Sequence, residues 1–199
     1  MSIFLIRHGQ TNGNRDRIVQ VPETPLSDLG QQQAIQLAAS FKHIAIDAII
    51  CSDHLRTQQT AYPLKNAGQP TFSLQPLLRE RDFGDLRGKP YDDIAADFFD
   101  ENYAPPNGET QMQFLERVHL AWELILKTYE NTATSLVVMT HGLVLRELIK
   151  QHLVADISLP QMSNFQNTCI TQVCATDKKT ILRLCDADHL GHAKTTGAV

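Results

Sequence analysis

The chain has 199 residues, of which 42% are hydrophobic and 20% are charged, and 18 Lys and Arg against 22 Asp and Glu give a net charge of −4. This length is enough for one domain with a sizeable core, and the mild acidic balance argues against a nucleic-acid binder, which usually has a clustered basic excess. Because no apolar run approaches the roughly 20 residues that cross a bilayer and the first residues lack a secretory signal pattern, we expect a soluble, cytoplasmic protein with no membrane partner.

Apolar runs of strand length alternate with segments of helical periodicity, which predicts an α/β fold. No repeat or linker divides the sequence. In chain order, its first half predicts a strand at 2–6, a polar loop at 11–25, a helix at 29–41, and strands at 46–50 and 71–74. A second helix is predicted between these last two strands. Ser27 and Ser52 precede the two helices and are their predicted N-caps.

The second half continues the alternation and ends in two strands. The predicted helices cover 91–99, 110–129 and 143–153, and the predicted strands cover 135–139, 169–175 and 181–185. Thr110 and Gln113 fit a capping box, and the helix after them has an apolar face made of Phe114, Val118, Ala121, Trp122, Ile125 and Tyr129. The last two strands flank a polar turn, so we expect an antiparallel hairpin at the sheet edge.

The cysteines give no sign of a metal site or of disulfides. Cys51, Cys169, Cys174 and Cys185 form no CxxC pair and no tight cluster with histidine. Cysteines spaced in this way are most often small buried side chains in a reducing compartment. We therefore predict neither a metal nor another cofactor.

Basic and histidine side chains follow three of the predicted strands. The first strand leads into Arg7-His8-Gly9, the second is followed by Arg56 in the first turn of a helix, and a third leads into Thr140-His141-Gly142. Ligands of open α/β sheets bind beyond the carboxyl ends of the strands, where helix N-termini also favour anions. Each residue alone is more often structural or solvated, but together they predict a phosphate-sized anion site.

Five segments resemble the histidine phosphatase superfamily, in its phosphoglycerate-mutase-like branch, in the same order over about residues 3–150. They are Arg7-His8-Gly9 with the residues up to Asn14, the stretch from Thr24 to Gly30, Ser52 to Ala61, Leu78 to Gly84, and Thr140-His141-Gly142. The resemblance implies a three-layer α/β/α sandwich with a mostly parallel central sheet and an antiparallel edge strand. It also implies one domain over residues 1–199, with a small cap-like insertion around 81–110; we expect a loose tail at 188–199.

The resemblance implies a role for each matching residue. His8 would be the nucleophile that forms a phosphohistidine, Glu80 would be the general acid, and Asp82 is the rival for that second role. Phosphate-binding residues would be Arg7, Asn14, Arg56 and His141, together with Gly142, Thr24 and Arg17. Arginine suits phosphate because its planar fork donates two parallel hydrogen bonds.

Departures from the mutase pattern favour a phosphatase. Gln10 stands where the mutases usually have an acidic residue, and residues 88–105 are short and acidic where the mutases have a longer, arginine-bearing insertion. The expected function is metal-independent hydrolysis of a small phosphorylated metabolite. A phosphoglycerate mutase dependent on 2,3-bisphosphoglycerate and a non-catalytic phosphate-binding protein stay as alternatives. A monomer and a homodimer both remain open, because the edge hairpin could pair with a second copy.

Overall fold

Six strands form one mixed sheet in the computed structural model, which describes residues 2–154, 165–174 and 176–193. The strand order is β3-β2-β4-β1-β5-β6. The pairs β1–β4, β2–β4 and β2–β3 are parallel, whereas β5 is antiparallel to β1 and β6 is antiparallel to β5. The strands are β1 (Ser2–Arg7), β2 (Ala48–Cys51), β3 (Thr71–Leu74), β4 (Leu136–Thr140), β5 (Ile170–Cys174) and β6 (Ile181–Asp186).

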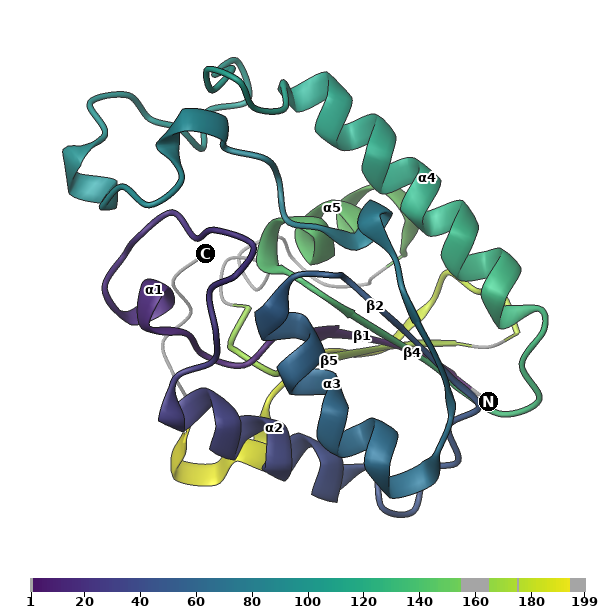
Figure 1. Ribbon diagram of the computed structural model, residues 1–199. Helices are drawn as coiled ribbons and strands as arrows, with labels where there is room; N and C mark the ends of the chain where they lie inside the picture. The colour runs from purple at the N-terminus through teal and green to yellow at the C-terminus, as the bar shows by residue number, and fades with distance from the viewer. Residues whose placement is uncertain (1, 155–164, 175, 194–199) are drawn as a thin grey trace.

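Helices cover both faces of the sheet, as Figure 1 shows, and this confirms the predicted three-layer arrangement. Because successive strand side chains point to opposite faces, Ile3 and Leu5 belong to one core, whereas Phe4 and Ile6 belong to the other. The first core lies under α4 and α5, and the second under α2 and α3. The helices are α1 (Asn12–Arg15), α2 (Asp28–Ser40), α3 (Leu55–Gly68), α4 (Gln111–Tyr129) and α5 (Gly142–His152).

The two best-marked helices begin where the sequence predicts. Ser27 Oγ accepts a hydrogen bond from the Gly30 N–H at the start of α2, at 3.1 Å. Thr110 and Gln113 form the reciprocal capping box of α4. The buried face of α4 is also the predicted one, from Phe114 to Tyr129. None of the helices in the described ranges is long and apolar enough to span a membrane.

The prediction of a helix over residues 91–99 is wrong. Only a single 3-10 turn forms there, Tyr91–Asp93. The side chains of Asp97 and Asp100 instead accept hydrogen bonds from the N–H groups of Phe99 and Asn102, two residues further along. Such local bonds compete with the helical ladder, and a helix would also have placed Asp93 and Asp97 four residues apart as a repulsive pair.

The tail predicted to be loose is structured over its first six residues. Residues Asp188–Ala193 form a 3-10 helix with a kink at Gly191. Leu190 within it is 1% exposed and belongs to the larger core. The burial of this one apolar side chain anchors the segment to the larger core. Residues 194–199 lie outside the described part of the chain.

Two segments project together beyond the carboxyl ends of the parallel strands, at the left of Figure 1: the loop after β1 and the segment from 81 to 110, which we call the cap segment. Backbone hydrogen bonds join them. The Gly88 N–H donates to Val19 O at 2.7 Å, and the Tyr91 N–H donates to Arg17 O, also at 2.7 Å. The cap segment is therefore held over the edge where β1, β2 and β4 end.

The beginning of α2 packs directly against the backbone that follows β1. A Cβ on Gly9 would lie 2.7 Å from Gly30 O, and a Cβ on Gly30 would overlap the carbonyl oxygen of Gln10. The Gln10 carbonyl also accepts the Ser27 N–H at 2.9 Å. Only glycine therefore fits at these two crossings, which fix the backbone next to His8.

We expect Gly30→Ala to lower the free energy of unfolding by about 2 kcal/mol or more, because the new methyl group must displace backbone. Helix propensity alone predicts the opposite sign, since alanine exceeds glycine by about 1 kcal/mol within a helix. Gly68→Ala is the matched control, because a Cβ there would lie 3.9 Å from Pro70. Urea denaturation of both variants measures the difference; equal stabilities would contradict the close approach.

Candidate active site

The ends of β1, β2 and β4 bring the predicted site residues together. Arg7 ends β1 and lies opposite Thr140 on β4, while Cys51 ends β2 and lies opposite Met139 on β4. The residues that follow, His8 and His141, have ring centroids 5.2 Å apart. Side chains that the sequence places after three separate strands therefore lie together at one edge of the sheet.

A cavity of about 40 Å³ opens at this point. Its wall is built by strand ends, by α3, by the loop after β1 and by the cap segment. The predicted residues that line it are Arg7, His8, Asn14, Arg56 and Glu80. The other lining residues are Val19, Gln20, His54, Arg81, Phe83, Arg87, Tyr91, Phe98, Phe99 and Leu143.

His8 is held as a neutral imidazole with one unprotonated nitrogen. Its Nδ1 lies 2.7 Å from Gly9 O, so Nδ1 carries the proton and donates it to that carbonyl. Arg56 Nε donates to His8 Nε2 at 3.3 Å, so Nε2 is the unprotonated nitrogen. Burial lowers the pKa of His8 well below its usual value, and the charges of Arg56 and Arg7 lower it further. The result is a nucleophilic nitrogen between two cations.

Arg7 and Arg56 place two guanidinium groups in the interior, where they are 1% and 2% exposed. Arg7 Nη1 donates to Phe165 O, and Arg56 Nη1 donates to Val21 O at 3.1 Å. Burial lowers the pKa of Arg56 to about 10, against the opposing charge of Glu80. Since a buried cation is costly without a counter-charge, the cavity between these two groups suits an anion.

Two further histidines lie beside His8. His141 Nε2 bonds with Ser52 Oγ at 2.9 Å, and the ring centroid of His54 is 5.0 Å from that of His141. Burial, then Arg56, lowers the pKa of both rings, to about 3 for His54 and well below the usual value for His141. His54 lines the cavity, whereas His141 is fully buried behind it.

Ser52 is not the N-cap of α3. The N-cap position is His54. Ser52 Oγ instead accepts the His54 N–H at 3.3 Å and contacts His141. The predicted cap is thus wrong, because this hydroxyl connects the two histidines rather than closing the helix end.

Of the two candidate acids, only Glu80 lines the cavity. Its Oε1 accepts the Arg81 N–H at 3.0 Å, and its Oε2 accepts the Leu143 N–H in the first turn of α5 at 3.2 Å. Asp82 faces elsewhere, where it accepts the Gly84 N–H at 2.7 Å and pairs with Arg87 at 3.1 Å. The helix N-terminus therefore orients the carboxyl group of Glu80.

The other predicted phosphate-binding residues divide into two groups. Asn14 lines the cavity, and its Oδ1 accepts from the Thr11 N–H and from Asn167, so its NH2 group is the end available to a ligand. Arg17 and Thr24 do not line it. The side chain of Arg17 is 59% exposed and lies over the ring of Tyr91. Gly142 is the buried first residue of α5.

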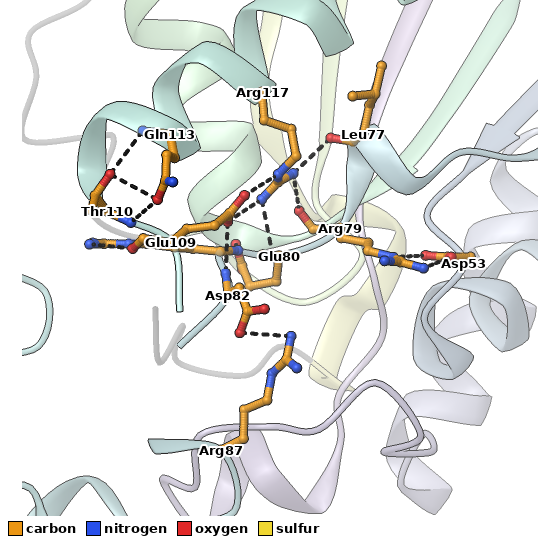
Figure 2. Close-up of polar contacts among 11 residues, drawn as sticks. Asp53, Leu77, Arg79, Glu80, Asp82, Arg87, Glu109, Thr110, Gln113 and Arg117 are labelled. Carbon is orange, nitrogen blue, oxygen red and sulfur yellow. Dashed lines mark hydrogen bonds and ion pairs between the residues drawn. The ribbon is translucent and has the colours of Figure 1, made fainter. Parts of the chain in front are cut away.

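Arg117 on α4 contacts the acid-bearing segment, which we define as Leu78 to Gly84 and which carries Glu80. No motif in the sequence points to Arg117. Figure 2 shows its guanidinium between the carboxylate of Glu109 and three backbone carbonyls, those of Leu77, Arg79 and Glu80. Glu109 Oε2 in turn accepts the Asp82 N–H at 2.9 Å. Burial alone would raise the pKa of Glu109, but the hydrogen bonds and charge of Arg117 hold it below its usual value.

His54 and Arg117 had weak signals in the sequence. His54 lies between Ser52 and Arg56 in a segment already singled out, and its position three residues after the end of β2 was the available clue. Arg117 lies on the polar side of a helix, where arginine is usually solvated. Its partners are backbone carbonyls forty and thirty-eight residues away, which side-chain patterns do not reveal.

Similarity to known proteins extends over nearly the whole chain. The sequence profile described as "Histidine phosphatase superfamily (branch 1)" matches residues 3–187. A "Probable phosphoglycerate mutase GpmB" of Escherichia fergusonii is 30% identical over 185 residues, which span 87% of this chain and 84% of that protein. A probable phosphatase of Schizosaccharomyces pombe is 29% identical, with 98% of both chains covered. Among solved structures, Bacillus stearothermophilus YhfR is similar with a TM-score of 0.79 and 25% identity, over 95% of this chain and 98% of that one.

We expect the free energy of unfolding to fall as the pH falls from 7 to 5.5. His8, His54 and His141 have pKa values below the usual 6.5 in the folded protein. The unfolded chain therefore binds more protons in this range, and each such histidine costs about 1.4 kcal/mol per pH unit below pH 6.5. Urea denaturation at several pH values measures the slope, which His54→Gln should reduce. NMR signals assigned to His8, His54 and His141 that titrate near pH 6.5 in the folded protein would contradict this expectation.

Arg117→Met should lower the free energy of unfolding by about 2–4 kcal/mol, because it leaves the charge of Glu109 and several carbonyls without their donor. Both partners are largely buried, with 17% and 20% of their side chains exposed. The control is Arg183→Met, which removes an ion pair with Asp186 whose arginine is 55% exposed; it should cost less than about 1 kcal/mol. Equal losses on urea denaturation would rule out a special role for Arg117.

Proposed function

The chain belongs to branch 1 of the histidine phosphatase superfamily, and from that membership we propose that it is a phosphomonoesterase that works through a phosphohistidine on His8. One observation carries the proposal above all others. The unprotonated Nε2 of His8 receives the Nε–H of Arg56 in a cavity that Glu80 also lines. A nucleophile, a cation and an acid thus share one small space.

In the first proposed step, His8 Nε2 attacks phosphorus while the bond from phosphorus to the ester oxygen breaks. Glu80, in its protonated form, transfers its proton to the leaving alkoxide, which departs as an alcohol. The products of this step are the alcohol, a phosphohistidine and the carboxylate of Glu80. Covalent catalysis of this kind divides one difficult displacement into two easier ones.

In the second step, the carboxylate of Glu80 takes a proton from a water molecule that attacks the phosphohistidine. The bond between phosphorus and Nε2 breaks, inorganic phosphate leaves, and both His8 and Glu80 return to their starting protonation states. The hydrogen bond from His8 Nδ1 to Gly9 O keeps the ring in one orientation through both steps.

Fixed positive charge supports both displacements. Arg7 and Arg56 are buried beside His8, and Asn14 would offer its amide NH2 to a non-bridging oxygen. Because phosphoryl transfer depends mainly on positioning and electrostatic stabilisation, these groups would suffice without a metal ion. His141 would act from behind the cavity, since it lies 5.2 Å from His8 between ring centroids and does not line the cavity.

The mutase alternative is supported by the names of several relatives, among them the one from Escherichia fergusonii. Both enzymes would use the same phosphohistidine and differ in whether water or a second hydroxyl accepts the phosphoryl group. Isomerisation of 3-phosphoglycerate, with and without bisphosphoglycerate, measured against phosphate release separates them. A non-catalytic phosphate-binding protein would show neither activity.

The proposed location is the cytoplasm. Its support is that Cys51, Cys169, Cys174 and Cys185 are all free thiols, which is the usual state in a reducing compartment.

Glu80→Gln should slow hydrolysis of alkyl phosphates by about 100-fold or more, because removal of a general acid–base typically costs 10²–10⁴-fold. With 4-nitrophenyl phosphate, whose leaving group needs no proton, the variant should release a burst of nitrophenol and accumulate phosphoenzyme. Glu116→Gln, at an exposed position of α4, is the matched control.

His8→Ala should give neither turnover nor phosphoenzyme, since it removes the unprotonated nitrogen that lies beside Arg56. Quenching in alkaline detergent preserves phosphohistidine for detection by mass spectrometry. An active His8→Ala protein, or complete loss of wild-type hydrolysis in EDTA, would overturn the proposed mechanism.

A further inference from the structure

Part of the wall of the cavity is aromatic. Four rings of the cap segment line it together: Phe83, Tyr91, Phe98 and Phe99. Their centroids lie 4.3 Å apart for Phe98 and Phe99, 5.0 Å for Tyr91 and Phe98, and 5.5 Å for Phe83 and Phe98. Such edge-to-face and tilted contacts make the rings one packed surface.

The rings differ in how much surface they can offer. Phe83 and Phe98 are 7% and 5% exposed and belong to the hydrophobic core. Tyr91 and Phe99 are only partly buried and pack against that core from the outside. All four rings line the cavity, but only Tyr91 and Phe99 keep solvent-exposed surface that a substrate could cover.

Two more arginines, Arg81 and Arg87, line the cavity; each has a partner in the chain, but Arg81 Nε is buried without one among the described residues. Arg87 pairs with Asp82 at 3.1 Å. Arg81 donates to Tyr103 O at 2.8 Å, and its guanidinium lies 5.6 Å from the ring centroid of Phe83. Between residues 91 and 110 the exposed charged side chains are all acidic and would repel a second anionic group; they are Asp92, Asp93, Asp97, Asp100 and Glu101. The rings and these carboxylates together favour an uncharged, apolar group next to the rings.

We infer that the alcohol part of the substrate is apolar, an aryl or aryl-alkyl group, and that Phe99 is the residue that selects it. The inference rests on the proposed function, because it assigns the group that leaves when His8 takes the phosphoryl group. An apolar leaving group gains free energy when it is buried against the rings. The hydroxyls of a polyol or the carboxylate of a phosphoglycerate would lose water there without a hydrogen-bond partner.

The test compares kcat/KM for 2-phenylethyl phosphate with that for glycerol 3-phosphate and 3-phosphoglycerate. All three are alkyl esters, and the phenylethyl alcohol is no better a leaving group than glycerol, so a preference reports recognition rather than intrinsic reactivity. We expect the wild type to prefer the phenylethyl ester by about tenfold or more.

Phe99→Ala should reduce this preference by at least about fivefold, because kcat/KM for the phenylethyl ester falls more than kcat/KM for glycerol 3-phosphate. Phe99→Leu, which keeps an apolar side chain, should retain most of the preference. Phe72→Ala is the matched control, because Phe72 is a half-buried ring on β3 that stacks on Tyr62 rather than lining this cavity; it should leave the preference unchanged.

Calorimetric binding of non-hydrolysable phosphonates to the wild type gives a second measurement that requires neither turnover nor a folded variant. The 3-phenylpropyl phosphonate should bind about tenfold or more tightly than the dihydroxybutyl phosphonate. Equal affinities, or a wild-type kcat/KM that is equal or higher for the polar esters, would overturn the inference. Absence of hydrolysis of every ester would instead refute the proposed function, with the phosphonate ratio still deciding this inference.

Discussion

Two guanidinium groups buried at one end of a parallel sheet are the constraint on which the rest of the site depends. Arg7 and Arg56 lie almost wholly out of water, where an unbalanced positive charge is costly. The surrounding groups limit that cost. His8, His54 and His141 stay neutral rather than adding charge, carbonyl oxygens accept from both arginines, and the carboxyl group of Glu80 lies in the same cavity. An anionic ligand would complete the balance.

The same constraint makes His8 chemically useful. Two cations and burial depress its pKa, so the ring stays unprotonated at a place where a phosphate would otherwise favour imidazolium. The consequence is a lower free energy of unfolding at acid pH, because unfolding allows the histidines to bind protons. The close passage of Gly9 and Gly30 and the bond from His8 Nδ1 to Gly9 O hold the ring while its Nε2 remains directed at Arg56.

The position of Glu80 depends on contacts with two helices. The Leu143 N–H at the start of α5 donates to one carboxyl oxygen of Glu80, and Arg117 on α4 donates to the backbone carbonyl of Glu80. Since the opposite face of α4 forms the core from Phe114 to Tyr129, one helix supports both packing and the site. The cap segment likewise has two faces, with aromatic rings turned to the cavity and carboxylates turned to solvent.

The sequence by itself determined the order of strands and helices, the layers, and the residues that follow the strands, because periodic burial and strand ends are local properties of the chain. The strand ends identified Arg7, His8 and Arg56, and the resemblance to the histidine phosphatase superfamily added Glu80 and Asn14; all five line one cavity. The sequence wrongly predicted a helix over 91–99, since side-chain bonds of Asp97 and Asp100 override the helical signal. Only the tertiary structure decided that His54 lines the cavity and His141 does not, and that four rings of the cap segment line it too. The contact of Arg117 with the backbone of Glu80 is likewise visible only there. The physical reason is that each depends on contacts between segments far apart in the chain.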